Sequence, residues 1–425
     1  MKYNNLIKIL NKRLLINQIT KEEEIKKILF KKKIALYCGF DPTADSLHLG
    51  HLLPIILLKR FQLLGHKPII LIGGATSLIG DPSFKLNERK LNNKNDIKIW
   101  SKKIENQIKY FLDFNYDFNN AIIINNYKWY KKINILYFLR NIGKYFYINK
   151  MIKKDFVKQR LNFEDKSISF TEFSYNLLQS YDFLKLYKKY KVILQIGGSD
   201  QWGNIVSGID LIYRIYKKKV FGLTSPIIKQ SNGIKFGKTE KKTIWLSKKK
   251  TSPYKFYQFW INVSDKDVYN FLKIFTFINI KKIDKLEKEE KKNTKKPKAQ
   301  YILAKEITRL VHGKKELNIA LRITKNLFKD CYNNLTKFDF LQLELNIPTI
   351  SFYINVSLKK SIIKAGFVNS YSKAYKIIKS NSISINNIKQ SNPEYIFNKK
   401  DRLYNYYTII KKGKKNFCLI LWKNF

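Results

Sequence analysis

The sequence predicts an α/β fold with a doubly wound parallel sheet, because strand–helix units recur along the chain. Near the start, apolar runs at 34–40 and 68–72 flank a helical pattern over 47–64. Two strands joined through a helix form a parallel pair with a right-handed crossover. Further on, the apolar run 192–196 leads into a helical pattern over 201–216. Ligands of such sheets bind at the carboxyl ends of the strands.

Three shorter signals complete this order of elements. Residues 226–228 are predicted to form a further strand. Thr20 and Glu23 have the spacing of a capping box, which opens a helix near the N-terminus. Thr171 suits the N-cap of a helix that continues through residue 182.

Periodicity and composition divide the chain into segments. We predict the parallel sheet in 1–245, a helical domain in 246–335, a linker at 336–350 and a small α+β domain in 351–425. Within the first, residues at about 86–165 are rich in Tyr, Ile and Lys and are predicted to form an inserted helical segment. The last segment has 15 basic and 2 acidic residues, which makes it a candidate RNA-binding module.

Charge is the most unusual property of the composition. With 83 Lys and Arg against 32 Asp and Glu, the 425 residues carry a net charge of +51. All but nine of the basic residues are Lys, and Ile, Asn, Tyr and Phe are also abundant. A codon bias of the genome explains this composition as well as a nucleic-acid partner does. Local motifs must therefore decide between these two explanations. Apolar residues make up 44 % of the chain, enough for a sizeable core.

The cysteines and apolar stretches exclude several classes of protein. Cys38, Cys331 and Cys418 are too few and too scattered for a disulfide framework or a zinc site, so we expect a reducing compartment and no zinc. The longest apolar stretches, such as 52–58, fall short of the roughly 18 residues that a membrane helix needs. No signal-peptide core is found at the N-terminus. We therefore expect a cytoplasmic protein without membrane contact.

Two histidines stand where the first predicted strand leads into its helix. His48 and His51 are three residues apart and share one helix face, at a helix N-terminus that favours phosphate. Gly50 between them would let a flat base approach the backbone. Such a pair can also be a surface accident or a metal pair. Its position at the carboxyl end of the first strand favours nucleotide binding.

A glycine-containing loop carries two lysines. Lys235 and Lys238 flank Gly237 and precede Thr239. A mobile loop of this kind can close over a triphosphate and neutralise the charge that develops on it. Because 74 lysines make the spacing common by chance, the loop gains meaning only beside the histidines.

Two further clusters predict a polar pocket. Tyr175, Gln179 and Asp182 form a stripe on one helix face, and this stripe lacks the Lys that marks other faces of the chain. We interpret it as buried, although such stripes are usually solvated. The segments 195–204 and 73–82 place glycines at predicted strand ends, where Asp200 can accept ribose hydroxyls. Each segment alone is also compatible with a tight turn.

Taken in order, these segments resemble the bacterial-type tyrosyl-tRNA synthetases, a family of class I aminoacyl-tRNA synthetases. The resemblance runs through nearly the whole chain and is carried by residues 37–51, 173–182, 195–204 and 235–239. It implies a Rossmann-like catalytic domain, an inserted segment that forms a homodimer, a helical anticodon-recognition domain and a small RNA-binding domain. It also implies ATP-dependent attachment of L-tyrosine to tRNA(Tyr), through tyrosyl-adenylate and with release of pyrophosphate. Mg²⁺ is expected to accompany ATP.

The resemblance also implies roles for single residues. His48, His51, Lys235 and Lys238 would act on ATP, with Thr43 on the side of the γ-phosphate. Tyr37 and Asp182 would bind the phenolic hydroxyl of tyrosine. The ammonium group would be held by Asp81, Tyr175 and Gln179, while Gln195 and Gln201 complete the tyrosine pocket. The further residues expected at ATP or the adenylate are Gly39, Asp41, Gly50, Asp200 and Thr239.

Some positions depart from the family pattern. Phe84 stands where the family usually has Gly, and Asn387 does the same in the last segment. Tyr375 and Lys376 replace frequent Arg residues, and Lys cannot fork onto phosphates as Arg does. The alternatives are a tryptophanyl-tRNA synthetase, a small adenylyltransferase, and a synthetase-like RNA-binding protein without activity. The last would be expected to lose His48, His51, Lys235 or Lys238.

Overall fold

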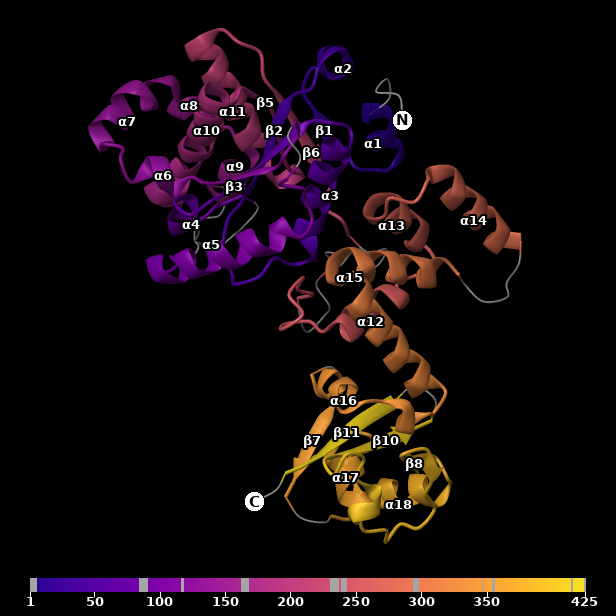
Figure 1. Ribbon diagram of the computed structural model, residues 1–425. Helices are drawn as coiled ribbons and strands as arrows, with labels where there is room; N and C mark the ends of the chain where they lie inside the picture. The colour runs from indigo at the N-terminus through magenta and orange to yellow at the C-terminus, as the bar shows by residue number, and fades with distance from the viewer. Residues whose placement is uncertain are drawn as a thin grey trace. The chain divides into compact units, whose positions relative to one another are not determined.

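The computed structural model describes residues 6–83, 91–115, 118–161, 168–229, 237, 243–292, 298–345, 347–353, 356–413 and 416–423. The chain forms two compact units (Figure 1). The first unit comprises Met1–Ser247 and Ser264–Ala299, and the second comprises Lys248–Val263 and Gln300–Phe425. Within the described stretches, no helix combines the length and the apolar composition that crossing a membrane requires.

The first unit is built on a six-stranded sheet of order β1-β6-β5-β2-β3-β4. Only the edge pair β1–β6 is antiparallel, and the other neighbours are parallel. The strands are β1 (Gln18–Ile19), β2 (Ala35–Phe40), β3 (Lys67–Ile72), β4 (Ile122–Asn125), β5 (Val192–Gly198) and β6 (Phe221–Ser225). The order reverses between β2 and β5, where such sheets bind their ligands. The predicted doubly wound α/β fold is therefore confirmed.

Helices cover the sheet because the side chains of its strands are apolar and must be buried. β3 is buried along almost its whole length, as a parallel strand with both faces covered must be. The helices that position the site are α3 (Leu49–Leu63), α10 (Phe170–Tyr190) and α11 (Trp202–Tyr216). The other helices of this unit are α1 (Leu6–Lys12), α2 (Glu22–Lys31), α4 (Thr76–Ile79), α5 (Lys94–Lys109), α6 (Tyr127–Tyr130), α7 (Ile135–Asn141), α8 (Ile148–Ile152), α9 (Asp155–Leu161), α13 (Val268–Phe275) and α14 (Ile280–Lys292).

Three local predictions were wrong. The strand expected at 226–228 is β6, which ends at Ser225 because Pro226 has no N–H to donate to a ladder. The N-cap of α10 is Ser169, whose hydroxyl accepts from the backbone N–H of Glu172 at 3.3 Å. Thr20 opens no capping box, since its hydroxyl accepts from the Gly222 N–H at 2.9 Å beside the β1–β6 pair.

The segment at about 86–165 is not entirely helical. It contains α5 to α9, but it also supplies β4, which pairs in parallel with β3. The β-branched run Ile122–Ile124 favours a strand at this sheet edge. One strand of the predicted insertion therefore belongs to the sheet. Because β4 ends at Asn125, the residues that follow it lie at the carboxyl edge of the sheet.

The second unit joins helices to a five-stranded sheet of order β7-β11-β10-β8-β9. Its helices are α12 (Pro253–Ile261), α15 (Ala299–Phe328, interrupted at Gly313 with φ 83°), α16 (Lys337–Glu344), α17 (Leu358–Lys364) and α18 (Tyr371–Lys379). Its strands are β7 (Thr349–Phe352), β8 (Ile383–Ile385), β9 (Ile388–Lys389), β10 (Tyr407–Lys412) and β11 (Asn416–Trp422). A core around Phe397 and Trp422 joins α17 and α18 to this sheet. Asn387 has φ 77°, a conformation that Asn tolerates and that explains why Gly is usual there.

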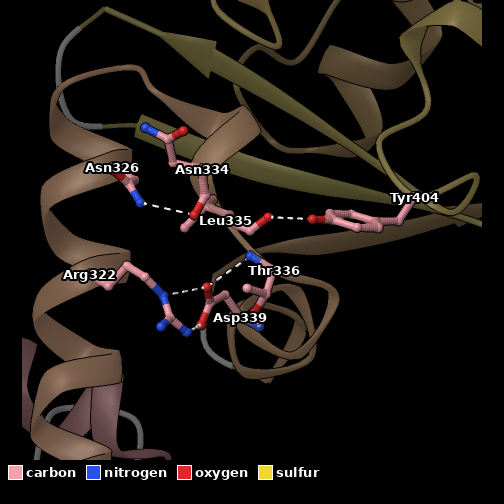
Figure 2. Close-up of polar contacts among 7 residues, drawn as sticks. All are labelled: Arg322, Asn326, Asn334, Leu335, Thr336, Asp339 and Tyr404. Carbon is pink, nitrogen blue, oxygen red and sulfur yellow. Dashed lines mark hydrogen bonds and ion pairs between the residues drawn. The ribbon is translucent and has the colours of Figure 1, made fainter.

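The segment predicted as a linker at 336–350 is folded. Thr336 and Asp339 form a capping box that opens α16. Arg322 of α15 donates two hydrogen bonds to Asp339, at 3.0 and 2.7 Å, and the Tyr404 hydroxyl donates to the Leu335 carbonyl at 2.9 Å (Figure 2). Phe340 stacks on Tyr407 of β10 with ring centroids 4.8 Å apart. The α16 segment therefore packs between α15 and the small sheet, while the domain limits themselves stay predictions.

Candidate active site

A cavity of about 540 Å³ opens at the carboxyl ends of β2, β3 and β5 in the first unit. Its walls come from the strand ends, from the N-terminus of α3 and from one face of α10. Fourteen residues that the sequence indicates line it: Tyr37, Gly39, Asp41, Thr43, His48, Gly50, His51, Asp81, Tyr175, Gln179, Asp182, Gln195, Asp200 and Gln201. Lys235, Lys238 and Thr239 lie outside the described residues, as does Phe84.

The histidine pair is held by the first turn of α3. His48 is the N-cap, and its Nδ1 accepts from the Gly50 N–H at 3.0 Å. Nδ1 of His51 accepts from the His48 N–H at 3.2 Å, and the two rings stack at 3.9 Å. Burial, followed by the neighbouring His48, holds the pKa of His51 well below its usual range. A neutral imidazole that accepts at Nδ1 carries its proton on Nε2, so the pair can present N–H donors to a phosphate.

The segment that follows the lysine loop is fixed to the start of α3. The Ile244 N–H donates to the Gly237 carbonyl at 2.9 Å, and the Leu49 N–H donates to the Ile244 carbonyl at 3.0 Å. Gly237 has φ +84°, and a Cβ added to it would lie 2.9 Å from Cβ of Leu49. Gly237, the centre of the predicted lysine motif, thus lies against Leu49, which directly follows the His48 N-cap.

A second part of the cavity offers hydrogen bonds to a neutral hydroxyl. Asp182 is 2 % exposed and accepts from Nε1 of Trp129 at 2.9 Å and from Nδ2 of Asn126 at 3.0 Å. Burial raises the pKa of Asp182 to about 7. The Tyr37 hydroxyl is buried and has no hydrogen-bond partner among the described residues. Burial, followed by the charge of Asp182, raises the pKa of Tyr37, and both side chains line the cavity.

A third part is acidic. The Tyr175 hydroxyl donates to Oδ2 of Asp41 at 2.7 Å, and Nε2 of Gln201 donates to Oδ2 of Asp81 at 2.7 Å. Among the described residues that line the cavity there are four Asp and no Lys or Arg. In a chain with a net charge of +51 this is a local reversal of sign, and it favours a ligand that carries an ammonium group.

Sequence reasoning missed several residues of this site. Trp129 and Asn126 lie in the segment predicted to be a helical insertion, and the β3–β4 pairing brings them to Asp182. Cys38 also lines the cavity, and burial raises the pKa of its thiol to about 12. Its position in the motif 37–51 was a signal that could have found it.

The described residues hold no group of three or more His, Cys, Asp or Glu side chains arranged to bind a metal ion. Asp81 and Asp182 accept hydrogen bonds from neutral side chains, as described above.

Comparison with known proteins identifies the class. Residues 30–329 match the family described as "tRNA synthetases class I (W and Y)", and the chain therefore belongs to this family. Residues 339–420 match the "Tyrosine--tRNA ligase SYY-like C-terminal domain". The predicted resemblance to class I tyrosyl-tRNA synthetases is confirmed.

Individual relatives are similar over the whole chain. A tyrosine–tRNA ligase of Pectobacterium atrosepticum is 56 % identical over 424 residues, covering 100 % of both chains. One from Hamiltonella defensa is 56 % identical over 421 residues, covering 99 % of both. Among solved structures, a C-terminally truncated mitochondrial tyrosyl-tRNA synthetase of Aspergillus nidulans superposes with a TM-score of 0.68 at 31 % identity. That likeness covers 76 % of this chain and 94 % of the other.

Proposed function

We propose that this chain attaches L-tyrosine to tRNA(Tyr) in two ATP-dependent steps. Full-length identity of 56 % to tyrosine–tRNA ligases supports the reaction. The observation that carries the choice of amino acid is the buried Tyr37 hydroxyl, which has no hydrogen-bond partner among the described residues and lines the same cavity as Asp182. A phenol supplies the partner that the Tyr37 hydroxyl lacks and a further donor to the Asp182 carboxylate.

In the first step the carboxylate of tyrosine attacks the α-phosphate of ATP, which forms tyrosyl-adenylate and releases pyrophosphate. No protein nucleophile takes part, so catalysis consists of positioning and of stabilising the charge on the phosphates. The Nε2–H groups of His48 and His51 donate to the phosphates, together with Lys235 and Lys238, and Thr43 lies on the γ-phosphate side. ATP enters as its magnesium complex.

Tyrosine lies along the acidic part of the cavity. Asp81, Tyr175 and Gln179 receive its ammonium group, Gln195 and Gln201 complete the pocket, and the phenol ends at Tyr37 and Asp182. The side-chain oxygen Oε1 of Gln195 is buried and has no hydrogen-bond partner among the described residues, which supports a ligand contact there. Asp41, Gly39, Gly50, Asp200 and Thr239 contact the nucleotide. In the second step a terminal ribose hydroxyl of the tRNA attacks the carbonyl carbon of the adenylate, which forms the tyrosyl ester and releases AMP.

Phenylalanine is rejected because it leaves the buried Tyr37 hydroxyl without a hydrogen-bond partner and offers no donor to Asp182. Tyrosyl-tRNA synthetases are themselves the reference case for this effect, at about 10⁵-fold, so the figure is the family's and not one obtained from this chain. A tryptophan enzyme of the same class is the second candidate, since the matched family covers both amino acids.

The chain works as a homodimer in the cytoplasm. Large apolar side chains gather on α7 and just before α8, where Ile135, Leu136, Tyr137 and Tyr147 are 52–73 % exposed. A patch of this kind on a folded unit marks a protein interface. Sedimentation of the chain and of Leu136→Glu tests the dimer, because a charge in an apolar interface should yield monomers.

A charging assay tests the whole reaction. Purified chain with ATP, Mg²⁺ and labelled tyrosine should make acid-precipitable tyrosyl-tRNA from a tRNA(Tyr) transcript and none from a tRNA(Trp) transcript with labelled tryptophan. Charging of tryptophan instead would replace the amino acid in this proposal. Failure with both would remove the activity.

A further inference from the structure

Three side-chain amides form a chain between α10 and α11, beside the cavity. Nδ2 of Asn176 donates to Oδ1 of Asn204 at 2.7 Å, and Nδ2 of Asn204 donates to Oε1 of Gln179 at 3.0 Å. Asn176 and Asn204 are each 2 % exposed, and only Gln179 of the three lines the cavity. Asn204 thus stands one hydrogen bond behind a cavity residue.

The order of donors and acceptors determines which end of the Gln179 amide is anchored. Because Oδ1 of Asn204 is occupied by Asn176, its NH₂ group is the end that faces Gln179. That NH₂ group can bond only to the carbonyl oxygen of Gln179, not to its nitrogen. A carbonyl oxygen has two lone pairs, so a second one remains for a donor in the cavity.

The same asparagine reaches the other side of the ammonium pocket. Its Nδ2 lies 3.5 Å from Oγ of Ser83, whose backbone N–H donates to Oδ1 of Asp81 at 3.0 Å. Asn204 therefore contacts both the helix that carries Gln179 and the loop that carries Asp81. An ammonium group brings donors only, so it needs the oxygen of Gln179 and not the NH₂ group.

We propose that Asn204 is a positioning residue for the α-amino group of the amino acid, acting through the orientation of the Gln179 amide. The inference rests on the proposed function, since it needs an amino acid with its ammonium group in this part of the cavity. A purely structural role would be to hold α10 against α11, and that role would not distinguish ligands with and without an amino group.

The test compares two ligands that differ only at the amino group. Binding of L-tyrosine and of 3-(4-hydroxyphenyl)propionate is measured by calorimetry with the full chain and with Asn204→Ala. We expect tyrosine to bind about tenfold more weakly to the variant, as for the loss of one buried hydrogen bond. The propionate, which lacks the amino group, should bind within about twofold of its wild-type affinity. Val206→Ala, an exposed position of α11, should change neither ligand.

Coupling to Gln179 gives a second readout. In Gln179→Ala the route through the amide is already lost, so adding Asn204→Ala should weaken tyrosine no further. Asn204→Ser, which keeps a donor and an acceptor, replaces Asn204→Ala if that variant does not fold. Equal weakening of both ligands, unchanged tyrosine binding, or additive effects of the two alanines would each overturn the inference. If the wild-type chain does not bind tyrosine at all, it is the proposed function that fails.

Discussion

Trp129 donates its indole N–H to Oδ1 of Asp182 at 2.9 Å, which joins α6 to the carboxylate at the end of the cavity. Asn126 donates to the other oxygen at 3.0 Å. Both donors favour the ionised form of Asp182 and so oppose the effect of burial on its pKa. The short segment after β4 therefore affects the charge of a buried carboxylate in the cavity.

Tyrosine binding should depend on pH through Asp182. Its carboxylate accepts the phenolic O–H most strongly when ionised, and its pKa in the ligand-free protein is about 7. Since the ionised carboxylate is the stronger acceptor, affinity should rise, by at most about tenfold, between pH 6 and pH 8. Fluorescence titrations across this range test it. Asp182→Asn should bind weakly with little pH dependence, and a flat profile for the wild type would contradict the assignment.

Removing the indole donor should move this profile. Trp129→Phe keeps the aromatic bulk but loses the bond to Oδ1, so the pKa of Asp182 should rise further. The midpoint of the pH dependence should shift upwards, and the affinity for tyrosine at pH 7 should fall several-fold. Trp100→Phe, on α5, is the matched control. An unchanged midpoint would show that the indole does not tune Asp182.

Gly237→Ala should impair activation without affecting tyrosine binding. A methyl group at φ +84° would be strained, and it would lie 2.9 Å from Cβ of Leu49 beside His48. We expect pyrophosphate exchange to fall at least tenfold, because Gly237 would be displaced from Leu49 at the start of the helix that carries the histidines. Gly366→Ala has a similar φ of +74° but nothing within 4 Å, so it controls for backbone strain. Equal losses of pyrophosphate exchange in Gly237→Ala and Gly366→Ala would contradict a role for the contact between Gly237 and Leu49.

Arg322→Ala should destabilise the second unit. Asp339 is completely buried, and without Arg322 its carboxylate loses two hydrogen bonds and its counter-charge. We expect a loss of about 3 kcal/mol in the free energy of unfolding, the low end for buried pairs because the Arg322 side chain is 42 % exposed. Urea titration measures it. Arg309→Ala breaks an exposed pair with Glu306 and should cost under about 1 kcal/mol. Similar losses in the two variants would mean that the Arg322–Asp339 pair stabilises the protein no more than an exposed ion pair does.

Local patterns predicted most of the cavity. The glycine, histidine and aspartate motifs directly follow strand ends. The parallel sheet therefore brings them together at its carboxyl edge, independently of the loop conformations. Trp129 and Asn126 could not be found this way, because their role depends on β4 pairing with β3, a contact between segments about 50 residues apart. The region is rich in Tyr, Ile and Lys and gave no polar signal of its own.

Other misses had signals that were outweighed. Thr336 and Asp339 have capping-box spacing, but the sequence Asn346-Ile347-Pro348 favoured a linker. Ser169 and Thr171 are both good N-caps, and only the hydrogen bond to Glu172 decides between them. The overall lysine excess hid the acidic character of the cavity, since charge reversal is visible only after folding.

The central claim is that this cavity activates tyrosine, and amino-acid-dependent exchange of labelled pyrophosphate into ATP tests it without tRNA. Tyrosine should support exchange, while phenylalanine and tryptophan should give no more than background, and Lys238→Ala should reduce the tyrosine signal strongly. Exchange with tryptophan in place of tyrosine, or none with any of the three from folded protein, would contradict the account.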